Sequence, residues 1–200
     1  MSENPSMSKV AHGIKTVYTA ELLVVFAGIC FILSIIIQTA VGLFSILSLV
    51  LLLFAFFIQL KGLKICSTED KGYKLAFELT LGMIFAAVLG AVLNAIWPNV
   101  FAGDSENTLL KIVSMMVSYY MITTTVRLLQ EKGAEKEAAA GKTALYLIIG
   151  AYLAEAVLDL VVLFAKVSTP LAIVAIVLAI VELIGSILYL IFLGKAWPKL

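Results

Sequence analysis

The stretch LLVVFAGICFILSIIIQTAVGLFSILSLVLLLFAFFIQL, residues 22–60, decides the fold class, because its 39 positions hold no charged residue. As one straight helix it would be about 58 Å long at 1.5 Å per residue. The hydrocarbon core of a bilayer is only about 30 Å thick, so the stretch predicts two membrane-spanning helices. We expect the turn between them at Gln38–Gly42, the least apolar point of the run.

The composition of the whole chain supports the same conclusion. The 200 residues are 62% hydrophobic and 14% charged, whereas soluble domains have about 45–50% apolar and 25% charged residues. A soluble fold of this size would not hide so much apolar surface. The sequence therefore predicts an all-α, polytopic membrane protein whose first partner is the lipid bilayer. The net charge of +1 argues neither for nor against nucleic acid, but with no water-facing domain to present a basic patch we expect no nucleic-acid partner.

The other apolar runs complete a set of six expected helices. A proline at position 170 suits the first turn of the last one, where its missing N–H costs nothing. We expect an N-terminal tail over 1–14, a six-helix transmembrane domain over 15–195 and a C-terminal tail over 196–200. The expected helices cover about 18–37, 42–60, 75–97, 109–130, 144–166 and 170–193.

The lysines and arginine predict the orientation, because positive charge concentrates on the cytoplasmic side of membrane proteins. Under the six-helix count only Lys111 and Lys166 fall on the outer side. Both termini are therefore expected in the cytoplasm. The short outer connections and small size suggest a cell membrane, specifically a bacterial inner membrane. The twelve positive residues on the inner side are Lys9, Lys15, Lys61, Lys64, Lys71, Lys74, Arg127, Lys132, Lys136, Lys142, Lys195 and Lys199.

Similar entry signals raise the prospect of an internal repeat. The first, third and fifth helices are entered through Lys15-Thr16, Tyr73-Lys74 and Lys142-Thr143. One interpretation is three tandem helix hairpins in a parallel repeat. The other is that every cytoplasmic helix end favours lysine, whatever its ancestry.

Three carboxylates at membrane depth form the main candidate site. Glu155 and Asp159 lie in the fifth helix and Glu182 in the sixth. Each costs about 2.5–3.5 kcal/mol at a helix centre, so a proton, a bound cation or amine, hydration or a basic partner must offset them. Helical spacing places further polar side chains beside them. These expected binding residues are Tyr152, Ser186 and Tyr189.

The fourth helix is expected to complete a polar cavity with the fifth and sixth. Its hydroxyl side chains recur at helical spacing, although such groups in membranes often only bond a neighbouring helix. The residues expected to line the cavity are Ser114, Ser118, Tyr120 and Thr124.

The third helix carries small residues at every fourth position. Gly82, Ala86 and Gly90 are followed at the same interval by Asn94. Small residues at this spacing let another helix approach closely, and an asparagine bonds across the contact. We interpret this face as a packing surface, within the bundle or in a homo-oligomer.

Enzymatic chemistry and cofactors are not expected. The chain has a single histidine and two cysteines without metal-ligand spacing, so no metal site, cofactor or Ser–His–Asp set is predicted. Two functions remain. The preferred one is a small transport or solute-binding protein that holds a proton, cation or amine-bearing solute at the carboxylates. The alternative is a non-transporting interaction, assembly or immunity subunit, or a transporter partner subunit, that packs through the third helix.

Overall fold

The structure is a computed structural model that describes residues 5–37, 41–96, 104–164 and 169–200. Side chains are described in these ranges apart from residues 5–8, 91, 93–95, 104–110, 159–164, 169–172, 175, 176 and 179. Over the described residues the chain forms six α-helices and one short 3-10 helix. They are α1 (Pro5–Ile36), α2 (Val41–Ser67), α3 (Lys71–Ile96), α4 (Asp104–Glu131), α5 (Glu135–Phe164), α6 (Thr169–Ala196) and η2 (Trp197–Lys199).

All six α-helices are long and apolar enough to cross a membrane, which confirms the expected all-α class and helix number for the described residues. The shortest has 26 residues and the longest 32. At 1.5 Å per residue these helices are about 39–48 Å long, so their ends extend beyond a 30 Å hydrocarbon layer.

The largest differences from the expected helix starts are in α1 and α5. α1 begins at Pro5 rather than near residue 18, so most of the expected polar tail over 1–14 is helical. The reason is packing, because Val10, Ile14 and Val17 recur at helical spacing and are all buried. α5 begins at Glu135 rather than near 144. Its first turns also join the core, through the buried Ala138.

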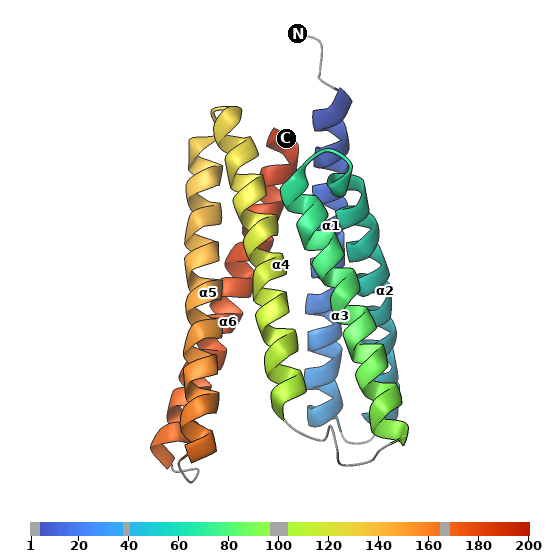
Figure 1. Ribbon diagram of the computed structural model, residues 1–200, viewed down its shortest axis with the longest axis vertical. Helices are drawn as coiled ribbons and strands as arrows, with labels where there is room; N and C mark the ends of the chain where they lie inside the picture. Colours follow the sequence, from blue (N-terminus) through green and yellow to red (C-terminus); the bar gives the residue numbers. More distant parts are fainter. Residues whose placement is uncertain (1–4, 38–40, 97–103, 165–168) are drawn as a thin grey trace.

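Consecutive helices pack against each other, and α6 also packs against α1, which closes the bundle (Figure 1). Both chain termini lie at the same end as the α2–α3 and α4–α5 turns. We call this the lysine end, and the other the opposite end. Each expected hairpin has packed helices, but the α2–α3 and α4–α5 pairs are packed too. The three-hairpin repeat therefore stays a prediction.

Local capping explains both turns at the lysine end. Asp70 precedes α3, and its Oδ1 accepts a hydrogen bond from the Gly72 amide at 2.7 Å, as an N-cap does. After α4, the Ala134 amide donates to the Leu129 carbonyl and the Gly133 amide to the Gln130 carbonyl. This is a Schellman motif, and Gly133 supplies its left-handed residue at φ 73°.

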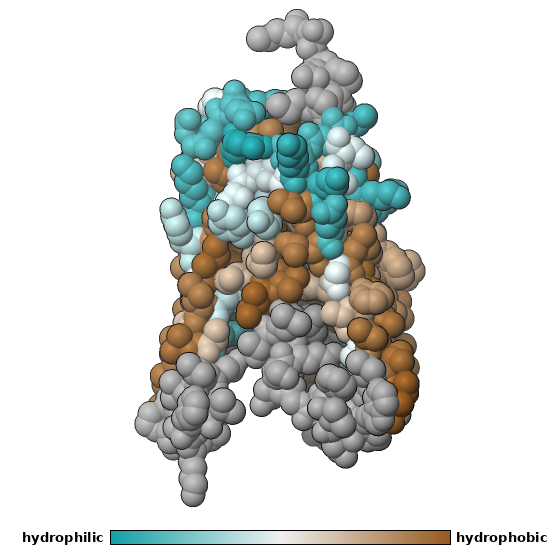
Figure 2. Space-filling view, in the orientation of Figure 1, coloured by the Kyte–Doolittle hydropathy of each residue, from teal (hydrophilic) through white to brown (hydrophobic). Residues whose placement is uncertain are grey.

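The hydrophobic core occupies the lysine end. From α3 to α6, the described buried residues nearest the opposite end mark the last buried level of these helices, and they are Thr80, Val117, Ala151 and Gly185. Between α1 and α2 burial continues farther, to Ser48, whose hydroxyl donates to the Ala27 carbonyl, and to Ser34. Towards the opposite end the helices expose large apolar side chains, and polar residues gather at the lysine end (Figure 2).

Candidate functional site

Three charged side chains from α4, α5 and α6 meet just beyond the last buried level. The Lys111 Nζ lies 3.5 Å from the Glu155 Oε2. The Glu182 side chain is within hydrogen-bonding reach of Glu155, and the Lys111 charge also acts on it. The side chain of Lys111 is 44% exposed and that of Glu155 19%. We call these three residues the acidic pair and its lysine.

Among the side chains that the structure describes, charge balance within this cluster is incomplete. Lys111 supplies one positive charge against two carboxyl groups, which leaves one negative charge if both are ionised. Two carboxyl groups that face each other do not both ionise readily, and a hydrogen bond between them requires that one carries a proton. The arrangement therefore suits one exchangeable proton or one additional cation.

The acidic trio expected from the sequence is brought together in part. Glu155 and Glu182 are neighbours, whereas the Asp159 side chain lies outside the described residues. Among the side chains that are described, no group of three or more His, Cys, Asp or Glu residues is arranged to hold a metal ion. The sequence analysis expected that a basic side chain could balance the carboxylates but did not identify it. In the structure it is Lys111.

The three hydroxyl residues expected beside the trio separate in space. Tyr152 is half-buried and close enough to Glu155, Glu182 and Lys111 to feel their charges. Tyr189 packs against the core towards the lysine end. Ser186 is exposed. Of these three, Tyr152 is the one that the fold places at the acidic pair.

The four residues expected to line a cavity along α4 also divide between two neighbourhoods. Ser114 faces α3, where its hydroxyl lies 3.4 Å from the Met83 sulfur. Thr124 is buried at the lysine end, where its hydroxyl fills the space above Gly72. Ser118 is half-buried, as is Tyr120, whose ring meets that of its chain neighbour Tyr119 edge-on.

The close helix contacts lie elsewhere than on the expected face of α3. A Cβ added at Gly82 would meet no described atom within 4 Å, so this glycine is not at a helix crossing within the bundle. At Gly62 of α2, an added Cβ would lie 2.9 Å from the Gly13 carbonyl of α1. Ala86 and Gly90 are half-buried, and the Asn94 side chain lies outside the described residues. The tight small-residue crossing therefore joins α1 and α2.

Sequence reasoning missed Glu21 as a neighbour of the site. This carboxylate of α1 is near enough to the Tyr152 and Tyr189 hydroxyls to act on them electrostatically. If the first helix began near residue 18, Glu21 would lie close to the membrane surface. With α1 beginning at Pro5, it lies at the middle of the helix. The buried stripe of Val10, Ile14 and Val17 was the available signal.

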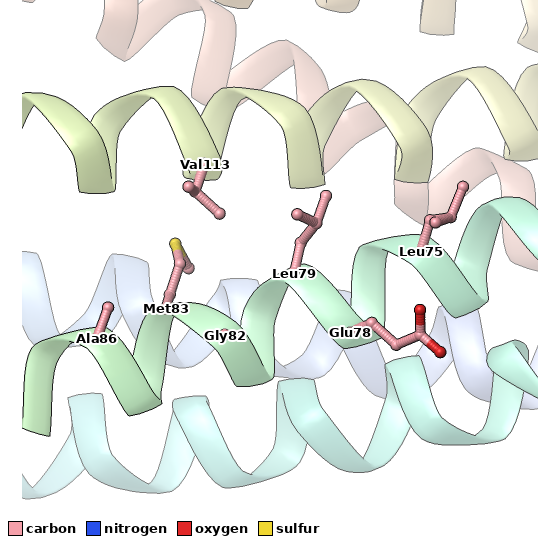
Figure 3. A pocket seen from close by; sticks show the side chains of 7 residues that line it. All are labelled: Leu75, Glu78, Leu79, Gly82, Met83, Ala86 and Val113. Carbon is pink, nitrogen blue, oxygen red and sulfur yellow. The ribbon is translucent and has the colours of Figure 1, made fainter. Parts of the chain in front are cut away.

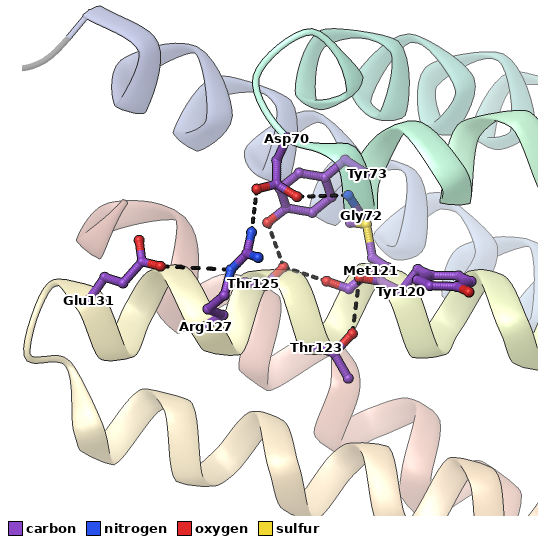
Figure 4. A network of polar contacts seen from close by, with 9 residues as sticks. All are labelled: Asp70, Gly72, Tyr73, Tyr120, Met121, Thr123, Thr125, Arg127 and Glu131. Atoms are coloured by element: carbon purple, nitrogen blue, oxygen red, sulfur yellow. Dashed lines mark hydrogen bonds and ion pairs between the residues drawn. The ribbon is translucent and has the colours of Figure 1, made fainter.

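A second polar network holds the lysine end together (Figure 4). Arg127 of α4 forms an ion pair with Asp70, the N-cap of α3, and a 3.7 Å contact with Glu131. The Tyr73 hydroxyl lies 2.8 Å from that of Thr125. Since the single Thr125 hydroxyl proton is donated to the Met121 carbonyl, Tyr73 is the donor in this pair.

Comparison of the chain with protein-family models, curated proteins and solved structures finds no match. Functional assignment for this chain therefore depends on the chemistry of its own residues.

Proposed function

We propose that this protein is a small integral membrane transport or solute-binding protein that holds an exchangeable proton at Glu155 and Glu182. The observation that carries the proposal is the acidic pair with its lysine, which α4, α5 and α6 bring together. Within a membrane isolated charges are unfavourable, and carboxylates that lie there often mark proton relays or coupling sites. The six apolar helices are compatible with this membrane location.

The proton is favoured over a metal ion as the bound species. Two carboxyl groups within hydrogen-bonding reach accommodate one proton between them. Lys111 already places an ammonium group beside Glu155, so an amine-bearing solute is the second ligand class that fits the same site. Such a solute would compete with the lysine for the carboxylate. No chemical reaction on the solute is part of the proposal.

The proposed topology has both termini in the cytoplasm and the protein in a cell membrane. It is supported by the gathering of lysines at the end that holds both termini and two of the turns. In this orientation the acidic pair lies farther from the cytoplasmic side than the packed core does.

Infrared titration of the carboxyl groups tests the proposal directly. In protein that carries Glu21→Gln, which removes the carboxyl group at the middle of α1, we expect one protonated carboxyl band to persist at neutral pH after reconstitution in nanodiscs. The band should be lost when Glu155→Gln and Glu182→Gln, together the double variant, are added. Glu78→Gln is the matched control, because Glu78 forms an exposed 3.8 Å pair with Lys74 and should not contribute to the band. A band unchanged in the double variant would refute the proton site.

Transport is tested in proteoliposomes with tetramethylammonium as the amine probe, because a quaternary ammonium ion has no neutral form that crosses a bilayer unaided. A pH gradient should drive its accumulation in vesicles that contain wild-type protein but not in those with the double variant. Retention of uptake by the double variant would show that the carboxyl pair does not serve transport. Equal uptake by protein-free vesicles would refute transport of this probe by the protein.

The alternative function is an interaction or assembly subunit that packs through α3. The observation that favours it is the exposed position of Gly82, where an added Cβ would meet no described atom within 4 Å. Disulfide trapping between copies with Ala86→Cys would detect a homo-oligomer, and co-purification would detect a transporter partner subunit.

A further inference from the structure

A groove of about 280 Å³ runs along α3 where it faces α4 (Figure 3). Met83, Leu79 and Leu75 of α3 extend towards α4, from which Val113 approaches. Gly82 forms part of the groove and has open space above its Cα. Apart from one acidic residue, the lining is apolar. The residues that line the groove are Leu75, Glu78, Leu79, Gly82, Met83, Ala86 and Val113.

The dimensions of the groove match one membrane leaflet. From Leu75 to Ala86 the helix advances eleven residues, or about 16 Å. Half of a 30 Å hydrocarbon core is about 15 Å. A single extended acyl chain of that length is narrow enough to lie along the groove.

Charged residues mark the end of the groove nearest the lysine end. Lys71, Lys74 and Glu78 follow one another on the same stripe of α3 as Gly82. All three are exposed, and the Lys74 Nζ lies 3.8 Å from the Glu78 Oε1. This end of the stripe therefore carries two positive charges and one negative charge. A headgroup phosphate placed there would be attracted to the lysines.

We propose that the α3–α4 groove binds one acyl chain of an anionic phospholipid whose phosphate lies against Lys71 and Lys74. Apolar contact along the groove supplies binding to the chain, and the lysines select the negative headgroup. None of the lining residues belongs to the acidic pair and its lysine, so the lipid site is tested separately from the proposed proton site.

Photocrosslinking tests the lipid site. The full chain is placed in phosphatidylcholine nanodiscs that contain a phosphatidylglycerol with a diazirine on one acyl chain. Crosslinked peptides should concentrate on residues 75–86. Gly82→Leu should reduce this labelling about fourfold or more, because the leucine side chain displaces part of the acyl chain. About fourfold is the loss of affinity expected when one methylene group is no longer buried. Gly28→Leu is the matched control, because an added Cβ there also meets open space.

The headgroup preference is tested by replacing Lys71 and Lys74 with glutamine. Labelling by phosphatidylglycerol should fall about fivefold for each lysine, while labelling by a phosphatidylcholine probe should be unchanged. Equal labelling of the Gly82→Leu variant and the wild type would overturn the site. Crosslinks spread evenly over the outer helices, or found between two copies of the chain at residues 75–86, would overturn it as well.

Discussion

The lysine end and the opposite end of the bundle both carry large apolar side chains, but they pack them differently. Within α2, Leu63 is 1% exposed at the lysine end, whereas Leu43 is 70% exposed at the opposite end. Hydrophobicity does not distinguish the two, because lipid tails are as apolar as leucine. What differs is close contact: glycine crossings, capped turns and polar bonds join helices at the lysine end. The acidic pair and its lysine lie just beyond that region.

Leucine truncations should break this comparison most clearly. Leu63→Ala is expected to cost about 2–5 kcal/mol in the free energy of unfolding, because it leaves a cavity in a packed region. Leu43→Ala should cost less than about 0.5 kcal/mol, since lipid fills the vacated space. Unfolding in detergent followed by circular dichroism measures both. Equal losses would mean that the opposite end is as tightly packed as the lysine end.

Glycine substitutions address the cause of the tight packing. Gly62→Ala should destabilise the fold by about 1–3 kcal/mol, because its Cβ would lie 2.9 Å from the Gly13 carbonyl and from the Val17 amide nitrogen. Gly28→Ala meets open space and should be neutral or slightly stabilising, since alanine favours a helix. The same unfolding assay compares them. A stable Gly62→Ala variant would contradict the close α1–α2 crossing.

The turn between α2 and α3 tests the polar part of the lysine end. Asp70→Ala removes both the N-cap of α3 and the ion pair with Arg127. We expect a loss of about 1–2 kcal/mol. Arg127→Gln removes only the ion pairs of an exposed side chain, so its loss should stay below about 1 kcal/mol. Hydrogen exchange at the start of α3 should rise in the first variant. If Arg127→Gln were the more damaging, the cap would not be the main contribution.

The smallest expected effect concerns the ion pair between Lys111 and Glu155. A double-mutant cycle on Lys111→Met and Glu155→Gln should give a coupling energy of about 0.5–1 kcal/mol, because the pair is partly exposed. The control cycle on Lys74 and Glu78, a longer and more exposed pair, should give less. Zero coupling at Lys111 and Glu155 would remove the ion pair from the proposed site.

Individual residues show how far sequence reasoning reached. The charge-free run over residues 22–60 predicted two helices correctly, since backbone groups in lipid must bond within their own helix. The spacing of Glu155 and Glu182 predicted similar depth on neighbouring helices, but Lys111 belongs to a third helix. The rotation of α4 relative to α5 depends on tertiary contacts, which no local sequence pattern encodes. Gly82 and Gly62 illustrate the same limit, because both are small and only one lies at a crossing.

The sequence by itself determined the class of this protein and the number of its helices. Each of these follows from the chain's own apolar and polar residues against a solvent of fixed thickness. Tertiary structure alone decided which end of the bundle packs, which glycines touch backbone and which cation faces Glu155. These outcomes depend on how separate helices rotate and cross, and close contacts among side chains distant in the chain set that geometry.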